Sequence, residues 1–316
     1  MYGSWQVIDK WAFRARSCDI GDEDIFIMSG MVVYDPKGSH KVRVFDVTYR
    51  QDQDGPWPAR IYQPEGQGPF PSLLDVHGGA WTWGSYTDNE RIDLSLAASG
   101  LVVAAIECCR APKYAYPSQV TDVNYATRWL KAHARDFNAD ADCIGGLGTS
   151  SGGHALFLSA MRPNDPRYRT LPLPEGEDVS ARLSYLLAAW PVLDPYARYL
   201  FAKENNRASL VEATNSYFLT HDAMKEGNPL LALERCEPVD LPPALIIQGT
   251  ADNNVPLSAL HRFIEVYRAA GGAVDIEWFP DMHHGFAYNY GAEPDRALEI
   301  MKAFVCRQLT GSKPAV

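Results

Sequence analysis

Short, continuous apolar runs recur along this chain of 316 residues, and segments with helical spacing separate them. The runs Leu101–Ile106, Leu183–Val192 and Ala244–Gln248 have the length and composition of strands that are buried on both faces. Apolar residues recur at helical spacing in Pro117–Phe137 and again in Leu257–Ala270. Strands that alternate with helices predict an α/β fold, with a mostly parallel central sheet and helices on both faces. Ligands of such sheets lie beyond the carboxyl ends of the strands.

Two segments depart from this alternation. Val42–Arg50 and Trp57–Gln63 are predicted strands separated mainly by the turn residues Asp54-Gly55-Pro56, so we expect an antiparallel hairpin there. Residues from about 194 to 240 combine polar and aromatic side chains with helical stretches and contain no clear strand. We therefore expect a single domain over residues 1–316, with an inserted helical lid or cap at about 194–240 and an N-terminal extension at about 1–40.

A glycine-rich turn follows the predicted strand Cys143–Leu147 and precedes the predicted helix Ser151–Met161. Its sequence is Gly148-Thr149-Ser150-Ser151-Gly152, in which only Ser150 has glycine two positions away on both sides. A G-x-S-x-G motif between a strand and a helix is the nucleophile elbow, a strained turn in which larger side chains would clash. Ser150 is therefore the predicted nucleophile.

A second glycine pair lies in the loop His77-Gly78-Gly79-Ala80-Trp81, directly after another predicted strand. An oxyanion hole needs free backbone N–H groups that approach the substrate closely, and glycine permits that approach. We predict that the N–H groups of Gly78, Gly79 and Ser151 form this hole.

An acid and a base follow the last two predicted strands. Asp252 comes after the first of them, and His283 and His284 come after the second. A carboxylate orients a histidine and stabilises its charged form, and histidine is the best general base near neutral pH. We predict Asp252 and His284 in these roles, since nucleophile, acid and base then occur in the order expected after such an elbow. His283 is the alternative base.

Three aromatic residues in and near the oxyanion loop, Trp81, Trp83 and Tyr86, are predicted to form the wall of an apolar substrate pocket. Ordinary core packing is the alternative for each of them. Their position beside the predicted oxyanion hole favours a small ester with an apolar or aromatic part.

Composition excludes several other classes. The net charge of −10 and the absence of a basic run argue against a nucleic-acid partner. The six cysteines include no CxxC pair, and no ligand cluster accompanies the paired histidines, so we expect neither a metal nor another cofactor. No run of about 18 apolar residues predicts a membrane span, and the first residues do not resemble a signal peptide, which favours a cytoplasmic location.

Together these motifs resemble the hormone-sensitive-lipase-like branch of the α/β-hydrolase serine esterases. The Ser151-Gly152-Gly153-His154 run is more similar to its acetyl-ester-hydrolase, feruloyl-esterase-like and kynurenine-formamidase-like relatives, and the HGGAW loop resembles the HGGxW loop of the formamidases. Arg110-Ala111-Pro112 with the later Tyr116-Pro117 and Asp122 is similar to the family's YRLAP…P…D stretch. Four residues depart from the family pattern, namely Thr149, Ala80, Cys108 and Cys109. The resemblance implies the α/β-hydrolase fold.

The motifs and the resemblance lead to one functional expectation and two alternatives. We expect a carboxylic-ester hydrolase that acts on small or short-acyl esters through a Ser-His-Asp triad and an acyl-enzyme. An amidase of the arylformamidase (kynurenine formamidase) type uses the same chemistry and is the first alternative. A hydrolase-like receptor that binds a small ligand without turnover is the second, and a homodimer is left open.

Overall fold

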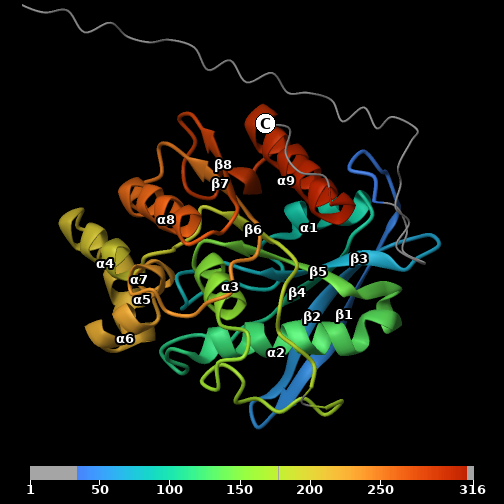
Figure 1. Ribbon diagram of the computed structural model, residues 1–316, viewed down its shortest axis with the longest axis horizontal. Helices are drawn as coiled ribbons and strands as arrows, with labels where there is room; N and C mark the ends of the chain where they lie inside the picture. Colours follow the sequence, from blue (N-terminus) through green and yellow to red (C-terminus); the bar gives the residue numbers. More distant parts are fainter. Residues whose placement is uncertain (1–33, 177, 312–316) are drawn as a thin grey trace, which may run out of the picture.

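The computed structural model describes residues 34–176 and 178–311 (Figure 1). In this part of the chain eight strands form one sheet, in the order β1-β2-β4-β3-β5-β6-β7-β8. The strands are β1 (Val42–Asp52), β2 (Gly55–Pro64), β3 (Phe70–Val76), β4 (Val102–Ile106), β5 (Ala139–Thr149), β6 (Leu186–Ala189), β7 (Ala244–Gly249) and β8 (Val274–Phe279). The helices are α1 (Glu90–Ala98), α2 (Ser118–His133), α3 (Ser151–Met161), α4 (Pro195–Glu204), α5 (Ala208–Phe218), α6 (His221–Glu226), α7 (Pro229–Glu234), α8 (Leu257–Ala269) and α9 (Ala292–Thr310).

The sheet is parallel except at its start. β1 pairs with β2 and β2 with β4 in antiparallel register, whereas every pairing from β4 through β3 to β8 is parallel. The predicted hairpin and the predicted mostly parallel sheet are therefore confirmed. β3, β4, β6 and β7 are buried along their whole length, which is why they form continuous apolar runs rather than alternating ones.

Helices lie on both faces of the sheet (Figure 1), and a layer of buried apolar side chains lies on each face. Successive residues of one strand face opposite layers: Leu74 belongs to the layer that includes residues of α2, α3 and α8, and Leu73 belongs to the layer that includes residues of α1 and α9. Each fully buried Leu, Val or Ile stabilises the fold by about 1.5–3 kcal/mol. This packing fixes the strands, and the strands fix the loops at their carboxyl ends.

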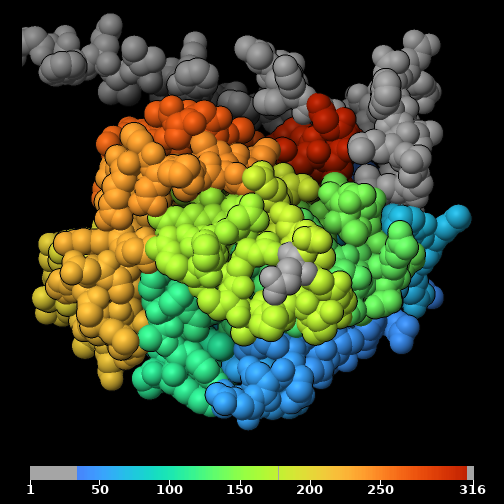
Figure 2. Space-filling model, turned by 60° about the horizontal axis from the view of Figure 1, so that its bottom comes forward, coloured from blue at the N-terminus to red at the C-terminus, as the bar shows by residue number. Residues whose placement is uncertain are grey.

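Helices α4 to α7 lie between β6 and β7 in the chain and stand out at one side of the molecule (Figures 1 and 2). Side chains cap three of them: Asp194 accepts the N–H of Ala197 at α4, Thr220 accepts at α6, and Asn228 accepts at α7. The amide of Asn228 also donates to Asp194 Oδ1 at 2.7 Å, which joins the starts of α4 and α7. This segment occupies the predicted lid or cap region, and its action as a lid stays a prediction.

The predicted ends of one strand and one helix were wrong. The apolar run Leu183–Val192 forms a strand only over Leu186–Ala189, because Trp190 has a φ of 43° and Pro191 cannot donate to a ladder. The predicted helix Pro117–Phe137 gives way to a short 3-10 helix at Ala134–Phe137. Of the N-terminal extension predicted at about 1–40, residues 1–33 lie outside the described residues.

Candidate active site

The predicted nucleophile lies in a sharp turn between β5 and α3. Ser150 has φ 51° and ψ −117°, a conformation that costs a non-glycine residue energy and is common at functional sites. A Cβ on Gly152 would lie 2.2 Å from the carbonyl oxygen of Val76, and one on Gly148 would lie 2.7 Å from Gly153 Cα. Only glycine fits at these two positions, so the motif reflects close backbone approach around a strained serine.

The structure brings the three predicted triad residues together. The hydroxyl of Ser150 donates to His284 Nε2 at 2.9 Å, and His284 Nδ1–H donates to Asp252 Oδ2 at 2.8 Å. Asp252 lies in the loop after β7, and His284 lies in the loop after β8. His283 instead hydrogen-bonds through Nδ1 to the carbonyl oxygen of Ala251 at 3.1 Å. Of the two histidines, His284 is therefore the one that contacts Ser150.

The carboxylate of Asp252 is buried but well supplied with donors. The N–H groups of Asn254 and Val255 donate to Oδ1 at 2.7 and 3.0 Å, and the Gln248 amide donates to Oδ2 at 2.9 Å. Burial opposes ionisation, yet the hydrogen bonds from His284, Asn254 and Gln248 outweigh it and lower the pKa of Asp252. Asp252 is therefore an ionised acceptor for the imidazole. Gln248 and Asn254 had no assigned role from the sequence, although both flank Asp252 closely.

The predicted oxyanion loop lies against the elbow. A Cβ on Gly78 would lie 3.1 Å from Ser150 Cβ, so this loop passes directly beside the serine. Gly79 has a φ of +112°, and a Cβ there would lie 1.9 Å from the carbonyl oxygen of Trp83. Ser151 follows Ser150 as the first residue of α3. The three predicted N–H donors thus come from two segments that meet at Ser150.

Trp81 connects the oxyanion loop to α3 and α5 through hydrogen bonds and ring packing. It is fully buried, and its backbone N–H donates to Ser151 Oγ at 3.2 Å. Its indole N–H donates to His154 Nδ1 at 3.2 Å, and its ring lies 5.4 Å from that of Tyr217 at an interplanar angle of 1°. His154 in turn donates from Nε2 to the carbonyl oxygen of Gly227 at 2.7 Å. Burial lowers the pKa of His154 to about 4, so this histidine is neutral and structural.

The other two predicted pocket residues have different surroundings. Trp83 is 48% exposed, whereas the hydroxyl of Tyr86 donates to Asp46 Oδ2 on β1 at 3.2 Å.

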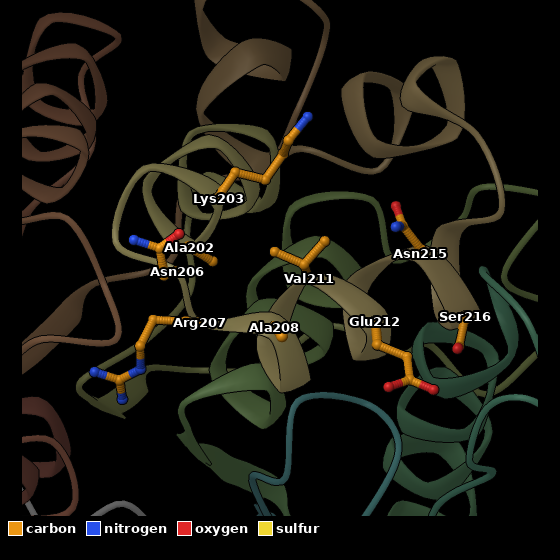
Figure 3. A pocket seen from close by; sticks show the side chains of 9 residues that line it. All are labelled: Ala202, Lys203, Asn206, Arg207, Ala208, Val211, Glu212, Asn215 and Ser216. Carbon is orange, nitrogen blue, oxygen red and sulfur yellow. The ribbon is translucent and has the colours of Figure 1, made fainter.

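A separate groove of about 740 Å³ lies between α4 and α5, where Val211 stands between Lys203, Arg207 and Glu212 (Figure 3). The lining of this groove is Ala202, Lys203, Asn206, Arg207, Ala208, Val211, Glu212, Asn215 and Ser216, and it includes no residue of the predicted triad.

Within residues 34–176 and 178–311, no group of three or more His, Cys, Asp or Glu side chains is arranged to hold a metal ion. None of the helices in that same part of the chain has both the length and the apolar character needed to cross a membrane.

Family models and curated relatives match much of the chain. The BD-FAE family model matches residues 59–265, and the dienelactone hydrolase family model matches residues 228–304. The esterase LipC of Mycobacterium tuberculosis (strain ATCC 25618 / H37Rv) is 31% identical over 75% of this chain and 58% of that protein. The chain spans about half the length of the curated relatives it matches.

Two solved structures are similar throughout most of the chain. A hyperthermophilic esterase from Pyrobaculum calidifontis has a TM-score of 0.70 at 22% identity, with 86% of this chain and 88% of that chain covered. Propionate-bound esterase 2 from Thermogutta terrifontis has a TM-score of 0.64 at 24% identity, with 84% and 93% covered. These similarities bear on the fold alone.

Proposed function

The chain belongs to the BD-FAE family and has the α/β-hydrolase fold, and we propose that it is a serine hydrolase that cleaves small or short-acyl carboxylic esters. The observation that carries the proposal is the hydrogen-bonded series from Ser150 through His284 to Asp252, with distances of 2.9 and 2.8 Å. The names of the relatives, esterase LipC and the probable carboxylic ester hydrolase LipM, support an ester as the substrate.

The proposed reaction is acyl transfer to water. Ser150 Oγ attacks the ester carbonyl while His284 Nε2 takes the hydroxyl proton, and Asp252 stabilises the resulting imidazolium. The N–H groups of Gly78, Gly79 and Ser151 stabilise the oxyanion. His284 then protonates the leaving alcohol. Water attacks the acyl-enzyme with His284 again as base, which releases the acid and restores Ser150.

Limited access to the serine supports a small substrate. Ser150 is 7% exposed and Asp252 is 9% exposed, so the reacting oxygen lies below the surface. The proposed pocket wall consists of Trp81, Trp83 and Tyr86, and Trp83, at 48% exposed, is the most accessible of them to a substrate. The cytoplasmic location and the homodimer expected from the sequence stay predictions.

Ester turnover by the native protein and by Ser150→Ala tests the proposal. A series of p-nitrophenyl esters from acetate to octanoate should be hydrolysed fastest at short acyl length. Ser150→Ala should lose kcat by about 10⁴- to 10⁶-fold, because the serine and the histidine act as a unit. Full esterase activity in Ser150→Ala would show that another group is the nucleophile.

Two further measurements separate the alternatives. A kcat/KM for N-formylkynurenine above that for every ester would favour the arylformamidase-type amidase. A fluorophosphonate probe should label the native protein and leave Ser150→Ala unlabelled. A native protein that neither reacts with the probe nor turns over any substrate of the panel would favour the non-catalytic receptor.

A further inference from the structure

A buried arginine on α4, Arg198, is held by hydrogen bonds to the neutral side chains of Asn254 and Thr214. Arg198 is 1% exposed, and no carboxylate among the described residues lies within ion-pair distance of it. Burying a charge without a counter-charge is unfavourable, so the surrounding structure must hold this side chain by other means. Hydrogen bonds to neutral groups must therefore stabilise the buried guanidinium.

Those hydrogen bonds lead to the loop that carries Asp252. Arg198 Nε and Nη2 both donate to the side-chain oxygen of Asn254, at 3.2 and 3.0 Å. Nη1 donates to Thr214 Oγ1 on α5 at 2.8 Å, which fixes the guanidinium from the other side. The backbone N–H of Asn254 donates to Asp252 Oδ1 at 2.7 Å. Arg198 thus holds the residue that helps orient the proposed catalytic acid.

The same guanidinium also faces the oxyanion loop. Its central carbon lies 5.5 Å from the ring centroid of Trp81, within the range of a cation–π interaction. Burial lowers the pKa of Arg198 to about 10, while the negative charge of Asp252 opposes this effect, so the side chain stays charged at neutral pH. One side chain of α4 therefore contacts both loops that flank Ser150.

We propose that Arg198 is a positioning residue, which holds Asp252 in place through Asn254 and so couples the α4–α7 segment to the triad. The inference rests on the proposed function, because it assigns Arg198 a role in the reaction of Ser150. It also implies that α4 must be seated correctly for the triad to react efficiently. Neither substrate nor oxyanion touches Arg198 in this scheme.

Kinetics of Arg198→Met, Asn254→Ala and the double variant test the inference, with a short-acyl p-nitrophenyl ester as substrate. Each single variant should lose kcat by about 10- to 100-fold with little change in KM, since a small displacement of a catalytic group reduces the rate without weakening binding. The double variant should lose no more than the worse single variant, because the two residues act through one contact. Arg198→Lys keeps the positive charge and can still donate to Asn254, although without the forked geometry of a guanidinium, so it should recover part of the loss.

Arg207→Met is the matched control. Arg207 also donates from the α4–α5 region to the same loop, but to Asn253 Oδ1 at 3.4 Å, and it is half-exposed. This variant should keep nearly native kcat. If Arg198→Met behaves like Arg207→Met, or if the losses in the double variant add, the positioning role is refuted.

The kinetics of Asn254→Ala and the activity of the native protein make the result interpretable in every case. If Arg198→Met does not fold, Asn254→Ala alone decides, because native kcat in that variant excludes the proposed path to Asp252. Turnover and fluorophosphonate labelling of the native protein are measured in parallel. An inactive, unlabelled native protein refutes the proposed function, whereas an active one with unaffected variants refutes only the role of Arg198.

Discussion

At the scale of single residues, the site depends on backbone positions that only glycine can occupy. Gly79 combines a φ of +112° with a Cβ position 1.9 Å from the carbonyl oxygen of Trp83. Any side chain there must displace either the loop or the Trp83 backbone. Because the preceding residue Gly78 lies so close to Ser150 that a Cβ on it would be 3.1 Å from Ser150 Cβ, such a displacement would move the proposed oxyanion donors.

We predict that Gly79→Ala lowers kcat/KM for a short-acyl ester by about 10²-fold, because donors moved by a fraction of an ångström stabilise the oxyanion poorly. Gly55→Ala is the matched control: Gly55 also has a positive φ, +106°, but among the described residues no atom other than those of its chain neighbours lies within 4 Å of its Cβ position. This control should lose about 1 kcal/mol of stability and keep its kcat/KM. An equal loss of kcat/KM in the two variants would contradict the assignment of this loop as part of the oxyanion hole.

Asp252 is the second residue whose role depends on its surroundings. Asp252→Asn should lower kcat by about 10⁴-fold at neutral pH, because an amide cannot stabilise the imidazolium and favours the wrong tautomer of His284. Fluorophosphonate labelling should slow in parallel, with far-UV circular dichroism as the check that the variant is folded. A loss below about tenfold would argue that His284 does not need this carboxylate.

At the scale of elements, a buried polar network joins β3, α1 and the elbow. Asn89 Nδ2 donates to Asp75 Oδ1 at 2.7 Å, and the hydroxyl of Thr149 donates to Asn89 Oδ1 at 3.2 Å. Thr149 directly precedes Ser150 and accepts from the hydroxyl of Tyr288 at 3.0 Å. Asp75 is fully buried beside the equally buried Asp93 of α1. Burial raises the pKa of Asp75 to about 7.

This raised pKa makes stability depend on pH in a definite direction. An unfolded aspartate ionises near pH 4, so between about pH 4 and 7 the folded protein binds more protons at Asp75 than the unfolded one does. The contribution of Asp75 to the free energy of unfolding therefore falls as the pH rises from about 4 to 7. Above pH 7 the folded protein bears the full cost of a buried, ionised Asp75.

Asp75→Asn removes this titration and keeps an acceptor for Asn89. We predict that its melting temperature relative to the native protein rises by about 2 °C or more between pH 5 and pH 8. Differential scanning calorimetry at the two pH values measures the change, and Asp136→Asn, at an exposed position, should show none. A pH-independent difference for Asp75→Asn would mean that Asp75 is already ionised at pH 5.

At the scale of the whole molecule, a buried ion pair fastens the antiparallel hairpin to the parallel part of the fold. Arg50 on β1 pairs with Asp122 on α2, and the two residues are 7% and 1% exposed. Asp122 also accepts the backbone N–H of Cys109, which follows the end of β4. Removing the arginine would leave a carboxylate buried without its counter-charge.

Arg50→Met should therefore lower the free energy of unfolding by about 3–5 kcal/mol, as measured by urea denaturation. The exposed pair between Arg60 and Asp46 lies on the same hairpin, so Arg60→Met is the matched control. It should cost at most about 1 kcal/mol, because solvent screens an exposed pair. Similar losses in the two variants would mean that burial does not decide the strength of the Arg50 pair.

The sequence by itself determined the fold class and the residues that the proposed chemistry needs. Buried parallel strands appear as continuous apolar runs, and the groups at their carboxyl ends lie at one edge of the sheet, which is why Ser150, Asp252 and His284 could be identified as a set. The end of β6 could not be identified, because the apolar residues after Ala189 continue although the backbone turns at Trp190.

Only the tertiary structure decided which side chains from separate elements meet. Nothing in the helical pattern around Arg198 indicates that its guanidinium reaches Asn254, and nothing around Asp75 indicates a network that extends to Thr149. The spacing of apolar residues in the sequence indicates which face of a helix or strand is buried. Contacts between polar groups on different elements depend on how those faces pack, and packing is a property of the assembled fold.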